Sequence, residues 1–151
     1  MSGWKPGRGL LGPLKPLMGD WVAEAEAHGQ VMVCTRTFVP FGKGWVRLEA
    51  VWNMGERGDY REVALFGAGD DGGLSFFSFT NDGKRSMGRL ADGSDVHPQA
   101  VAFEARMPAG LARMIYWPAD DEEPGFCFAV ESRNRKGWNR FLLHRYQPAE
   151  T

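Results

Sequence analysis

The side chains with the clearest chemical potential are a histidine and a tyrosine near the end of the chain. His144 and Tyr146 stand two positions apart, and a strand over 138–146 places both on one face. The same face of that strand would carry Trp138, Arg140 and Leu142. An imidazole beside a phenol can hydrogen-bond a carboxylate or a carbonyl group, and a neutral imidazole can also ligate a haem iron. A histidine near a rim that satisfies only a local hydrogen bond would leave the same pattern.

Large apolar side chains recur at alternate positions of several other segments, which is typical of strands that share one buried face. The faces in question read Val46, Leu48, Ala50 and Trp52, then Leu74 and Phe76, then Phe126, Phe128 and Val130. Core packing is the commonest role of such residues, but together they describe the wall of an apolar cavity. We therefore predict a ligand site formed by Trp21, Trp52, Phe76, Tyr116, Phe128, His144 and Tyr146.

The segments that must position these side chains are short and are separated by residues that form tight turns. The expected strands cover 21–27, 31–39, 45–54, 60–67, 74–80, 85–90, 100–106, 112–117, 126–132 and 138–146. Connections this short, such as Asn81-Asp82-Gly83, join only antiparallel neighbours. The resulting meander can form an open sheet, a sandwich or a closed barrel, and closure removes the exposed edges. The sequence thus predicts an all-β, ten-stranded antiparallel up-and-down barrel.

The start of the chain is rich in glycine and proline. Residues 1–16 are expected to form a flexible arm and cap, followed by a barrel domain over 17–147 and a tail over 148–151. The apolar cap would consist of Leu10, Leu11, Leu14 and Leu17. In the first strand, the side chains expected to face the lumen are Trp21, Ala23, Ala25 and Ala27, with Glu24 and Glu26 facing solvent. Small inward side chains make way for bulky neighbours or leave room for a ligand, and Trp21 is expected to seal the capped end.

Composition and charge exclude several classes of function. The 151 residues include 18 basic and 19 acidic side chains, a net charge of -1, which gives no field to attract nucleic acid. No apolar run approaches the ~20 residues that span a bilayer, and the first residues do not form a signal sequence, so we expect a cytoplasmic protein without membrane association. The three histidines have no metal-ligand spacing, and no hydrolase or nucleotide motif is present. Cys34 and Cys127 are expected to be ordinary strand residues.

The stretch over 17–25 resembles the Gly-x-Trp signature at the first strand of the calycin superfamily, which includes the lipocalins, the intracellular fatty-acid-binding proteins and nitrobindin. Gly19 and Trp21 match it, whereas Ala23 and Ala25 replace the two later glycines of the nitrobindin form, Gly-x-Trp-x-Gly-x-Gly. The resemblance implies a lipocalin-like barrel whose lumen binds a small hydrophobic, lipid-like molecule.

The last strand resembles those of the same families. It ends on Tyr146, as in an uncharacterised bacterial lipocalin-like domain family. Fatty-acid-binding proteins hold a carboxylate there with Arg-x-Tyr, and in this chain His144 replaces the arginine. A neutral imidazole lacks the paired donors of a guanidinium, which argues against firm carboxylate binding. Nitrobindins ligate haem through a last-strand histidine, so the resemblance also admits haem bound at His144.

The sequence is also compatible with catalysis in the lumen or with a role of the outer surface. Some calycin barrels catalyse cyclisation or decarboxylation with lumen tyrosine, arginine and glutamate side chains. The residues that could serve in this way are Tyr60, Glu62, Arg113, Tyr116 and Tyr146. A barrel without a ligand could instead act through its surface, for example as a homodimer. We prefer binding of a small hydrophobic ligand in the lumen, and assign no catalytic residue and no metal.

Overall fold

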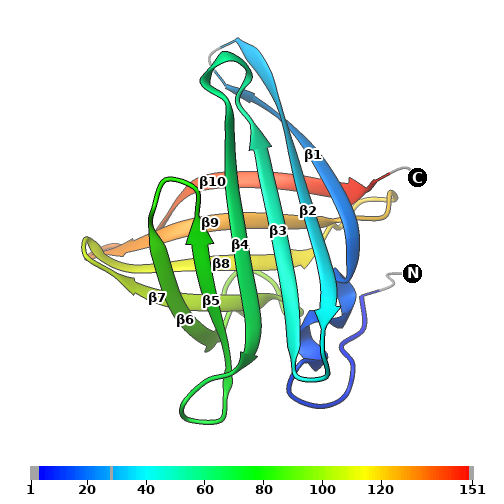
Figure 1. Cartoon of the computed structure of the whole chain (residues 1–151), viewed down its shortest axis with the longest axis vertical. Coiled ribbons are helices and arrows are strands. Elements are labelled where there is room, and N and C mark those ends of the chain that lie inside the picture. Colours follow the sequence, from blue (N-terminus) through cyan, green and yellow to red (C-terminus); the bar gives the residue numbers. More distant parts are fainter. Residues whose placement is uncertain (1–3, 28, 150–151) are drawn as a thin grey trace.

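A computed structural model describes residues 4–27 and 29–149 and shows a closed barrel of ten antiparallel strands (Figure 1). The first three residues of the expected arm, His28 and the last two residues of the expected tail lie outside the described residues. Each strand pairs with the next one along the chain, and the last pairs with the first to close the ring. The predicted all-β, up-and-down barrel is therefore confirmed.

The strands begin and end close to the predicted positions. They are β1 Gly19–Ala27, β2 Gln30–Phe41, β3 Trp45–Asn53, β4 Asp59–Ala68, β5 Leu74–Thr80, β6 Arg85–Ala91, β7 Val101–Met107, β8 Gly110–Pro118, β9 Phe126–Asn134 and β10 Gly137–Pro148. The described residues also form two short 3-10 helices, η1 Gly12–Leu17 and η2 Gly55–Arg57. Neither has the length or the apolar character that crossing a membrane requires. In Figure 1, β2 to β5 run nearly vertically and β8 to β10 nearly horizontally, so the two halves of the ring cross steeply.

A glycine in β6 allows two strands and an aromatic ring to approach closely. Gly88 pairs with Ala105 of β7. A Cβ atom at this glycine would lie 2.1 Å from the Glu104 carbonyl oxygen and 2.6 Å from an atom of the Phe76 ring. No side chain fits at such distances, so the approach depends on glycine. The space beside Gly88 is taken by Phe76, which is buried.

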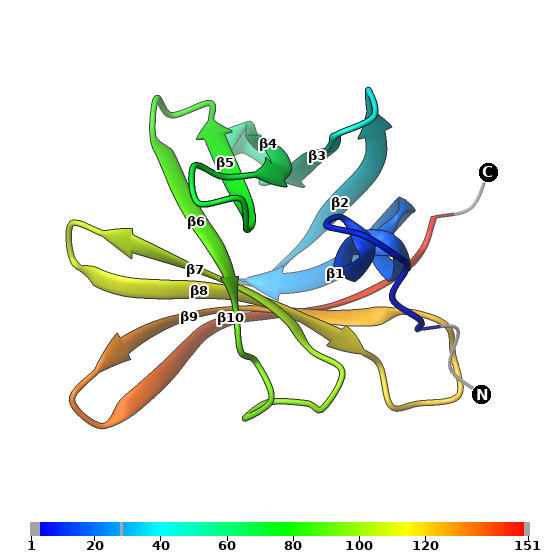
Figure 2. The same cartoon turned by 90° about the horizontal axis from the view of Figure 1, so that it is seen from below.

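The N-terminal segment closes one end of the barrel, where η1 lies beside β1 and β2 (Figure 2). Leu14 and Leu17 of η1 are fully buried in the core, as expected for an apolar cap. The Trp21 Nε1 donates a hydrogen bond of 2.7 Å to the Leu17 carbonyl oxygen, and its ring packs edge-on against Phe126 at 4.7 Å. Leu10 was expected in the same cap, but it is 40% exposed, because it lies in the turn that the Gly12 nitrogen closes by donating a hydrogen bond to the Gly9 carbonyl oxygen.

The arm before η1 packs against the barrel instead of lying free of it. Trp4 is buried, its ring lies 6.4 Å from that of Phe126, and its Nε1 donates a hydrogen bond of 3.1 Å to the Gln99 carbonyl oxygen. Trp4 is therefore fastened to β9 and to the connection between β6 and β7.

A β-bulge changes which side chains of β10 point inward. The register with β9 shifts between Arg140 and Leu142, because one extra residue stands on β10 at this point. Leu142 packs with the core, and His144 and Tyr146 are buried. On the other side of the bulge, Arg140 and Trp138 lie on the outer face, where the Arg140 Nε donates a hydrogen bond of 2.9 Å to Glu131. The prediction that all five residues share one face is therefore wrong for Trp138 and Arg140.

Candidate functional site

The interior of the barrel is lined by aromatic rings that contact one another. On β4, β5 and β7, Phe66 lies 6.1 Å from Phe76 and 5.1 Å from Phe103. On β8 to β10, a second group brings Tyr116 within 4.8 Å of Phe128 and stacks Phe126 on Tyr146 at 5.2 Å. The two groups meet at Phe38 of β2, which lies near both Phe66 and Tyr116. An aromatic interior of this kind is consistent with binding of an apolar molecule.

An arginine lies inside this aromatic interior. Arg36 on β2 is 1% exposed, and its guanidinium carbon lies 3.9 Å from the centre of the Phe128 ring. The rings of Tyr116 and Tyr146 are 5.6 Å and 5.8 Å away. Three ring faces therefore surround one positive charge, a stabilising arrangement that is strongest away from water.

Among the described residues, no side chain or backbone group forms a hydrogen bond of good geometry with the Arg36 guanidinium. Its Nε, Nη1 and Nη2 atoms form no hydrogen bond of good geometry, and neither do the Tyr116 hydroxyl, the Tyr146 hydroxyl or the His144 Nδ1. The two phenol oxygens still lie close enough to the guanidinium to act on its charge. Buried polar groups are nearly always paired, and an unpaired one costs about 1–3 kcal/mol. Several such groups lie together here, which makes this cluster the candidate site of the barrel.

The carboxylate that balances the Arg36 charge comes from β4. Glu62 Oε1 lies 3.6 Å from Arg36 Nη2, which is an ion pair but is too long for a hydrogen bond. The other oxygen, Glu62 Oε2, accepts a hydrogen bond from the Ser78 hydroxyl. Glu62 is 17% exposed, against 1% for Arg36, so the negative charge of this pair lies closer to solvent than the positive one.

The electrostatic surroundings fix the protonation of the cluster near neutral pH. Burial raises the pKa of Tyr116 to about 12 and also raises the pKa of Tyr146. Burial, followed by the positive charge of Arg36, lowers the pKa of His144. Burial alone would lower the pKa of the Arg36 guanidinium, but Tyr116, Tyr146 and Glu62 outweigh it and raise that pKa. The cluster thus presents a permanent cation, two neutral phenols and a neutral imidazole.

The structure brings together most of the residues predicted to form a ligand site. Tyr116, Phe128 and Tyr146 surround Arg36, and the His144 ring lies 6.1 Å from Tyr146 and 5.7 Å from Trp52. The remaining two predicted residues, Trp21 and Phe76, do not contact Arg36 directly.

Trp21 and Phe76 border the cluster from other sides. Trp21 contacts the cluster through Phe126, and it also lines a surface cavity of about 660 Å³ with Trp4 and the 119–125 loop. Phe76 belongs to the ring group on β4, β5 and β7, where it contacts Phe66 and Phe103. Direct contact of either residue with a ligand stays a prediction.

The residue that sequence reasoning missed is Arg36. In Cys34-Thr35-Arg36-Thr37-Phe38 the arginine alternates with two threonines, and it therefore shares a face with a cysteine and a phenylalanine that are both buried. That alternation was the available signal. Cys34 and Cys127 are both free thiols, as expected of ordinary strand residues.

One of the residues considered for catalysis lies outside the lumen. Arg113 of β8 points to the outer face, where its two terminal nitrogens donate hydrogen bonds of 2.9 Å and 2.7 Å to Asp95. Its Nε donates a third bond of 2.7 Å to Glu131. Arg113 thus anchors the connection between β6 and β7 against the barrel, and it cannot act in the lumen. Glu62, Tyr116 and Tyr146 do gather there.

The His144 ring lies 5.7 Å from the Trp52 ring and 6.1 Å from the Tyr146 ring. Haem binding at His144 stays a prediction. Among the described residues, no three histidine, cysteine or acidic side chains gather as they would around a metal ion.

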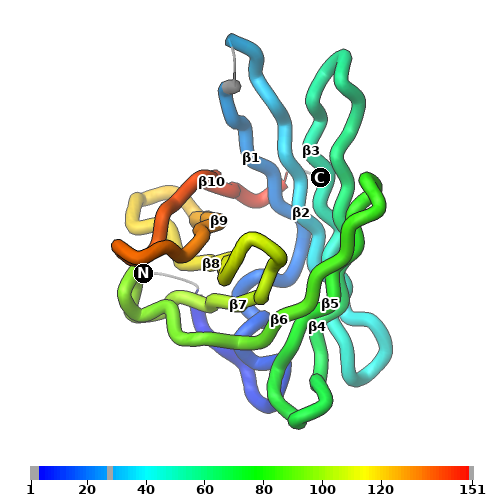
Figure 3. Tube along the Cα trace, turned by 90° about the vertical axis from the view of Figure 1, so that its left-hand side faces the viewer, coloured from blue at the N-terminus to red at the C-terminus, as the bar shows by residue number. Residues whose placement is uncertain are grey.

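One end of the lumen is more accessible than the other. Toward the hairpins opposite η1, the inward side chains are only half-buried, as seen for Trp52, Tyr60, Met114 and Leu142. Figure 3 shows the β1–β2 and β3–β4 hairpins projecting beyond the rest of the ring at this end. Glu62 and these side chains are therefore more exposed to solvent than Arg36.

No protein-family model matches this sequence, and no curated protein is significantly similar to it. The closed, ten-stranded antiparallel barrel is compatible with a calycin-like fold.

Proposed function

We propose that this protein binds a small, lipid-like molecule inside the barrel. The observation that carries this proposal is the set of unpaired polar groups around Arg36 within an interior that is otherwise aromatic. A ligand with an apolar body and one polar end suits such a site, since its body replaces ring contacts and its polar end pairs the buried donors.

Binding requires side chains to move, because the rings of the interior contact one another. The half-buried residues at the accessible end, Trp52 and Leu142, have fewer neighbours to hold them than the fully buried rings. We therefore propose that the ligand enters at this end and that its apolar body lies between Trp52 and the rings of β8 to β10.

A neutral fluorescent probe tests this proposal. N-phenyl-naphthylamine, which becomes bright in apolar surroundings, is titrated into the wild-type protein and into Ala25→Trp. Ala25 is half-buried and shares the inward face of β1 with buried Ala23, so a large ring there narrows the accessible end. The affinity of the probe is expected to fall at least about tenfold.

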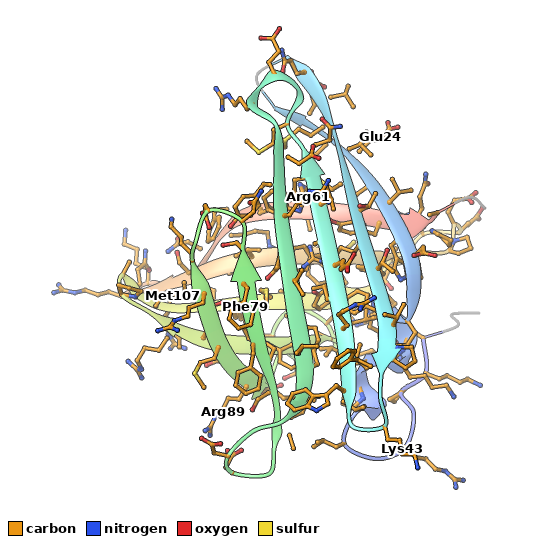
Figure 4. All side chains as sticks on the ribbon, in the orientation of Figure 1. Glu24, Lys43, Arg61, Phe79, Arg89 and Met107 are labelled. Atoms are coloured by element: carbon orange, nitrogen blue, oxygen red, sulfur yellow. The ribbon has the colours of Figure 1, made fainter. Side chains whose placement is uncertain are left out.

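The matched control is Glu24→Trp, which places the same ring one residue away on the solvent side, where Glu24 points outward (Figure 4). This variant should bind the probe as the wild-type protein does. The proposal fails if the wild-type protein does not bind the probe, or if both tryptophan variants bind it equally.

A further inference from the structure

Most of the unpaired polar groups in the lumen are hydrogen-bond donors. A guanidinium carries five N–H donors and no acceptor, and the nitrogens of Arg36 form no hydrogen bond of good geometry with the described residues. The protonated phenols of Tyr116 and Tyr146 add two hydroxyl donors. A site rich in donors and poor in acceptors is suited to an oxygen-bearing anion.

Glu62, the counter-ion of Arg36, does not satisfy the hydrogen-bond donors of the guanidinium. A buried charge is costly unless it is both paired and hydrogen-bonded. Glu62 supplies the pairing but not the hydrogen bonds, because its Oε1 lies 3.6 Å from Arg36 Nη2 and its Oε2 accepts a hydrogen bond from Ser78 instead. The Phe128 ring at 3.9 Å compensates the charge only in part, since a ring face has no lone pair to accept a hydrogen bond.

We infer that the lumen site selects an apolar molecule with a single anionic head group, which Arg36, Tyr116 and Tyr146 hold, and that this head group displaces Glu62 from Arg36. This inference rests on the proposed function and adds to it the charge of the ligand. Glu62 is the group that gives way, because it is partly exposed and reaches solvent on release.

The charge of the head group follows from the groups that face it. Arg36 is the one cation of the cluster described above, His144 is neutral, and the pKa of Cys34 is raised by burial so that its thiol keeps its proton. A monoanion cancels one guanidinium charge. A dianion would leave a negative charge uncompensated in a buried aromatic site, at high cost.

The experiment compares three ligands that each carry a twelve-carbon chain and differ in the charge of the head group. They are dodecanoate (anionic), dodecanol (neutral) and dodecyltrimethylammonium (cationic). Each is titrated near neutral pH against the bound neutral probe. Because hydrogen bonds to a charged group are worth more than neutral ones, dodecanoate is expected to bind about 10- to 100-fold more tightly than dodecanol, and the cationic ligand more weakly than both.

Two variants assign the selectivity to named groups. Arg36→Met keeps an apolar side chain of similar length and should abolish the preference for dodecanoate while dodecanol still binds. Glu62→Gln removes the competing carboxylate and should bind dodecanoate about tenfold more tightly than the wild-type protein. It should also melt at a lower temperature without ligand and recover with dodecanoate but not with dodecanol. The control is Arg61→Met, because Arg61 lies on the outer face and is exposed (Figure 4).

Each outcome decides a separate point. Equal binding of dodecanoate and dodecanol by the wild-type protein, or an acid preference that survives in Arg36→Met, overturns the inference while the proposed function stands. Weaker dodecanoate binding by Glu62→Gln overturns the displacement of Glu62. If no ligand displaces the probe and the probe itself does not bind, the proposed function fails as well. If Arg36→Met does not fold, Glu62→Gln decides alone.

Discussion

Arg36 occupies a position at which a well-packed apolar side chain is expected to give a barrel at least as stable. Replacing buried charged groups by well-packed apolar ones is often neutral or stabilising, and the neighbours Cys34 and Phe38 are already apolar and buried. Proteins commonly retain such unfavourable groups where function needs them. The arginine and its two phenols are therefore expected to trade stability for binding.

The phenols allow this trade to be measured. Tyr116→Phe and Tyr146→Phe each remove a buried hydroxyl that has no hydrogen-bond partner, so the free energy of unfolding should stay constant or rise by about 1 kcal/mol. Binding of dodecanoate by the same variants should weaken. Urea denaturation and the probe titration measure the two effects, with half-buried Tyr60→Phe as the control. A clear loss of stability would show that these hydroxyls stabilise the ligand-free protein.

His144 gives the protein a dependence of stability on pH. Its pKa in the folded state is lowered by burial and by Arg36, whereas an unfolded histidine has a pKa of about 6.5. As the pH falls, the unfolded chain takes up a proton first, so stability is lost as the pH decreases below about 6.5 toward the folded pKa. Above that value the contribution is constant.

The His144→Gln variant tests this dependence. It lacks the titrating group, so its stability relative to the wild-type protein should increase between about pH 7 and pH 5. Denaturant unfolding at a series of pH values measures the difference. Parallel curves for the two proteins would mean that His144 is protonated equally in the folded and unfolded states.

Sequence patterns identified most of the site but not its centre. Aromatic residues and a histidine attract attention because they are uncommon and usually buried or functional, and so Tyr116, Phe128, His144 and Tyr146 were predicted. An arginine between two threonines is typical of a solvent-facing position. Its alternation with Cys34 and Phe38, which are both buried, places Arg36 on the inward face, but a charged side chain flanked by two threonines outweighed that signal.

The bulge in β10 determines which side chains reach the lumen. Phe141 is the extra residue and is 65% exposed, and Leu143, two positions further along, is 52% exposed. The paired residues on either side of the bulge, Arg140 with Glu131 and Leu142 with Val130, would be consecutive pairs of a regular ladder if Phe141 were absent.

Deletion of Phe141 and deletion of Leu143 should therefore have very different effects on stability. Loss of Phe141 leaves every other side chain on its present face and is expected to change the free energy of unfolding by about 1 kcal/mol. Loss of Leu143 turns either Leu142 or the buried pair His144 and Tyr146 outward, at a cost of about 3–5 kcal/mol or more. Thermal unfolding of the two variants compares them. Equal destabilisation would mean that the bulge itself is needed for the curvature of the strand.

The strands could be predicted because their ends carry turn residues, as at Asn81-Asp82-Gly83, where Gly83 has a φ of 86° in a conformation that favours glycine. The bulge in β10 could not be predicted. An extra residue leaves the local composition unchanged and only inverts the inward and outward alternation of the side chains beyond it. The prediction for β10 was thus right from Leu142 onward and wrong before it.

The ring of strands is closed by one short pairing. β1 and β10 share only the pairs Trp21 with Pro148 and Val22 with Gln147 among the described residues, and one further bond of 2.9 Å joins the Ala149 nitrogen to the Asp20 carbonyl oxygen. β1 pairs with β2 over its whole length. Beyond Val22, β1 therefore has a ladder on one side only, at the accessible end of the lumen.

Hydrogen–deuterium exchange should reveal this difference. Amides of residues 23–27 should exchange faster than those of β3, which is paired on both sides with β2 and β4, because strand edges open more readily than strand centres. Bound dodecanoate should slow exchange over 23–27 and leave β3 unchanged. Equal protection of the two strands would contradict a weak closure between β1 and β10.

The same short pairing has a kinetic consequence. Nine of the ten strand pairings join neighbours in sequence, and such local contacts form early because little chain entropy is lost in closing short loops. The pairing of β1 with β10 instead brings together the two ends of the chain. It should form last, after an open ten-stranded sheet that exposes two unpaired edges. Aggregation during refolding should therefore depend on protein concentration, and substitutions that strengthen the pairing at Val22 and Gln147 should suppress it.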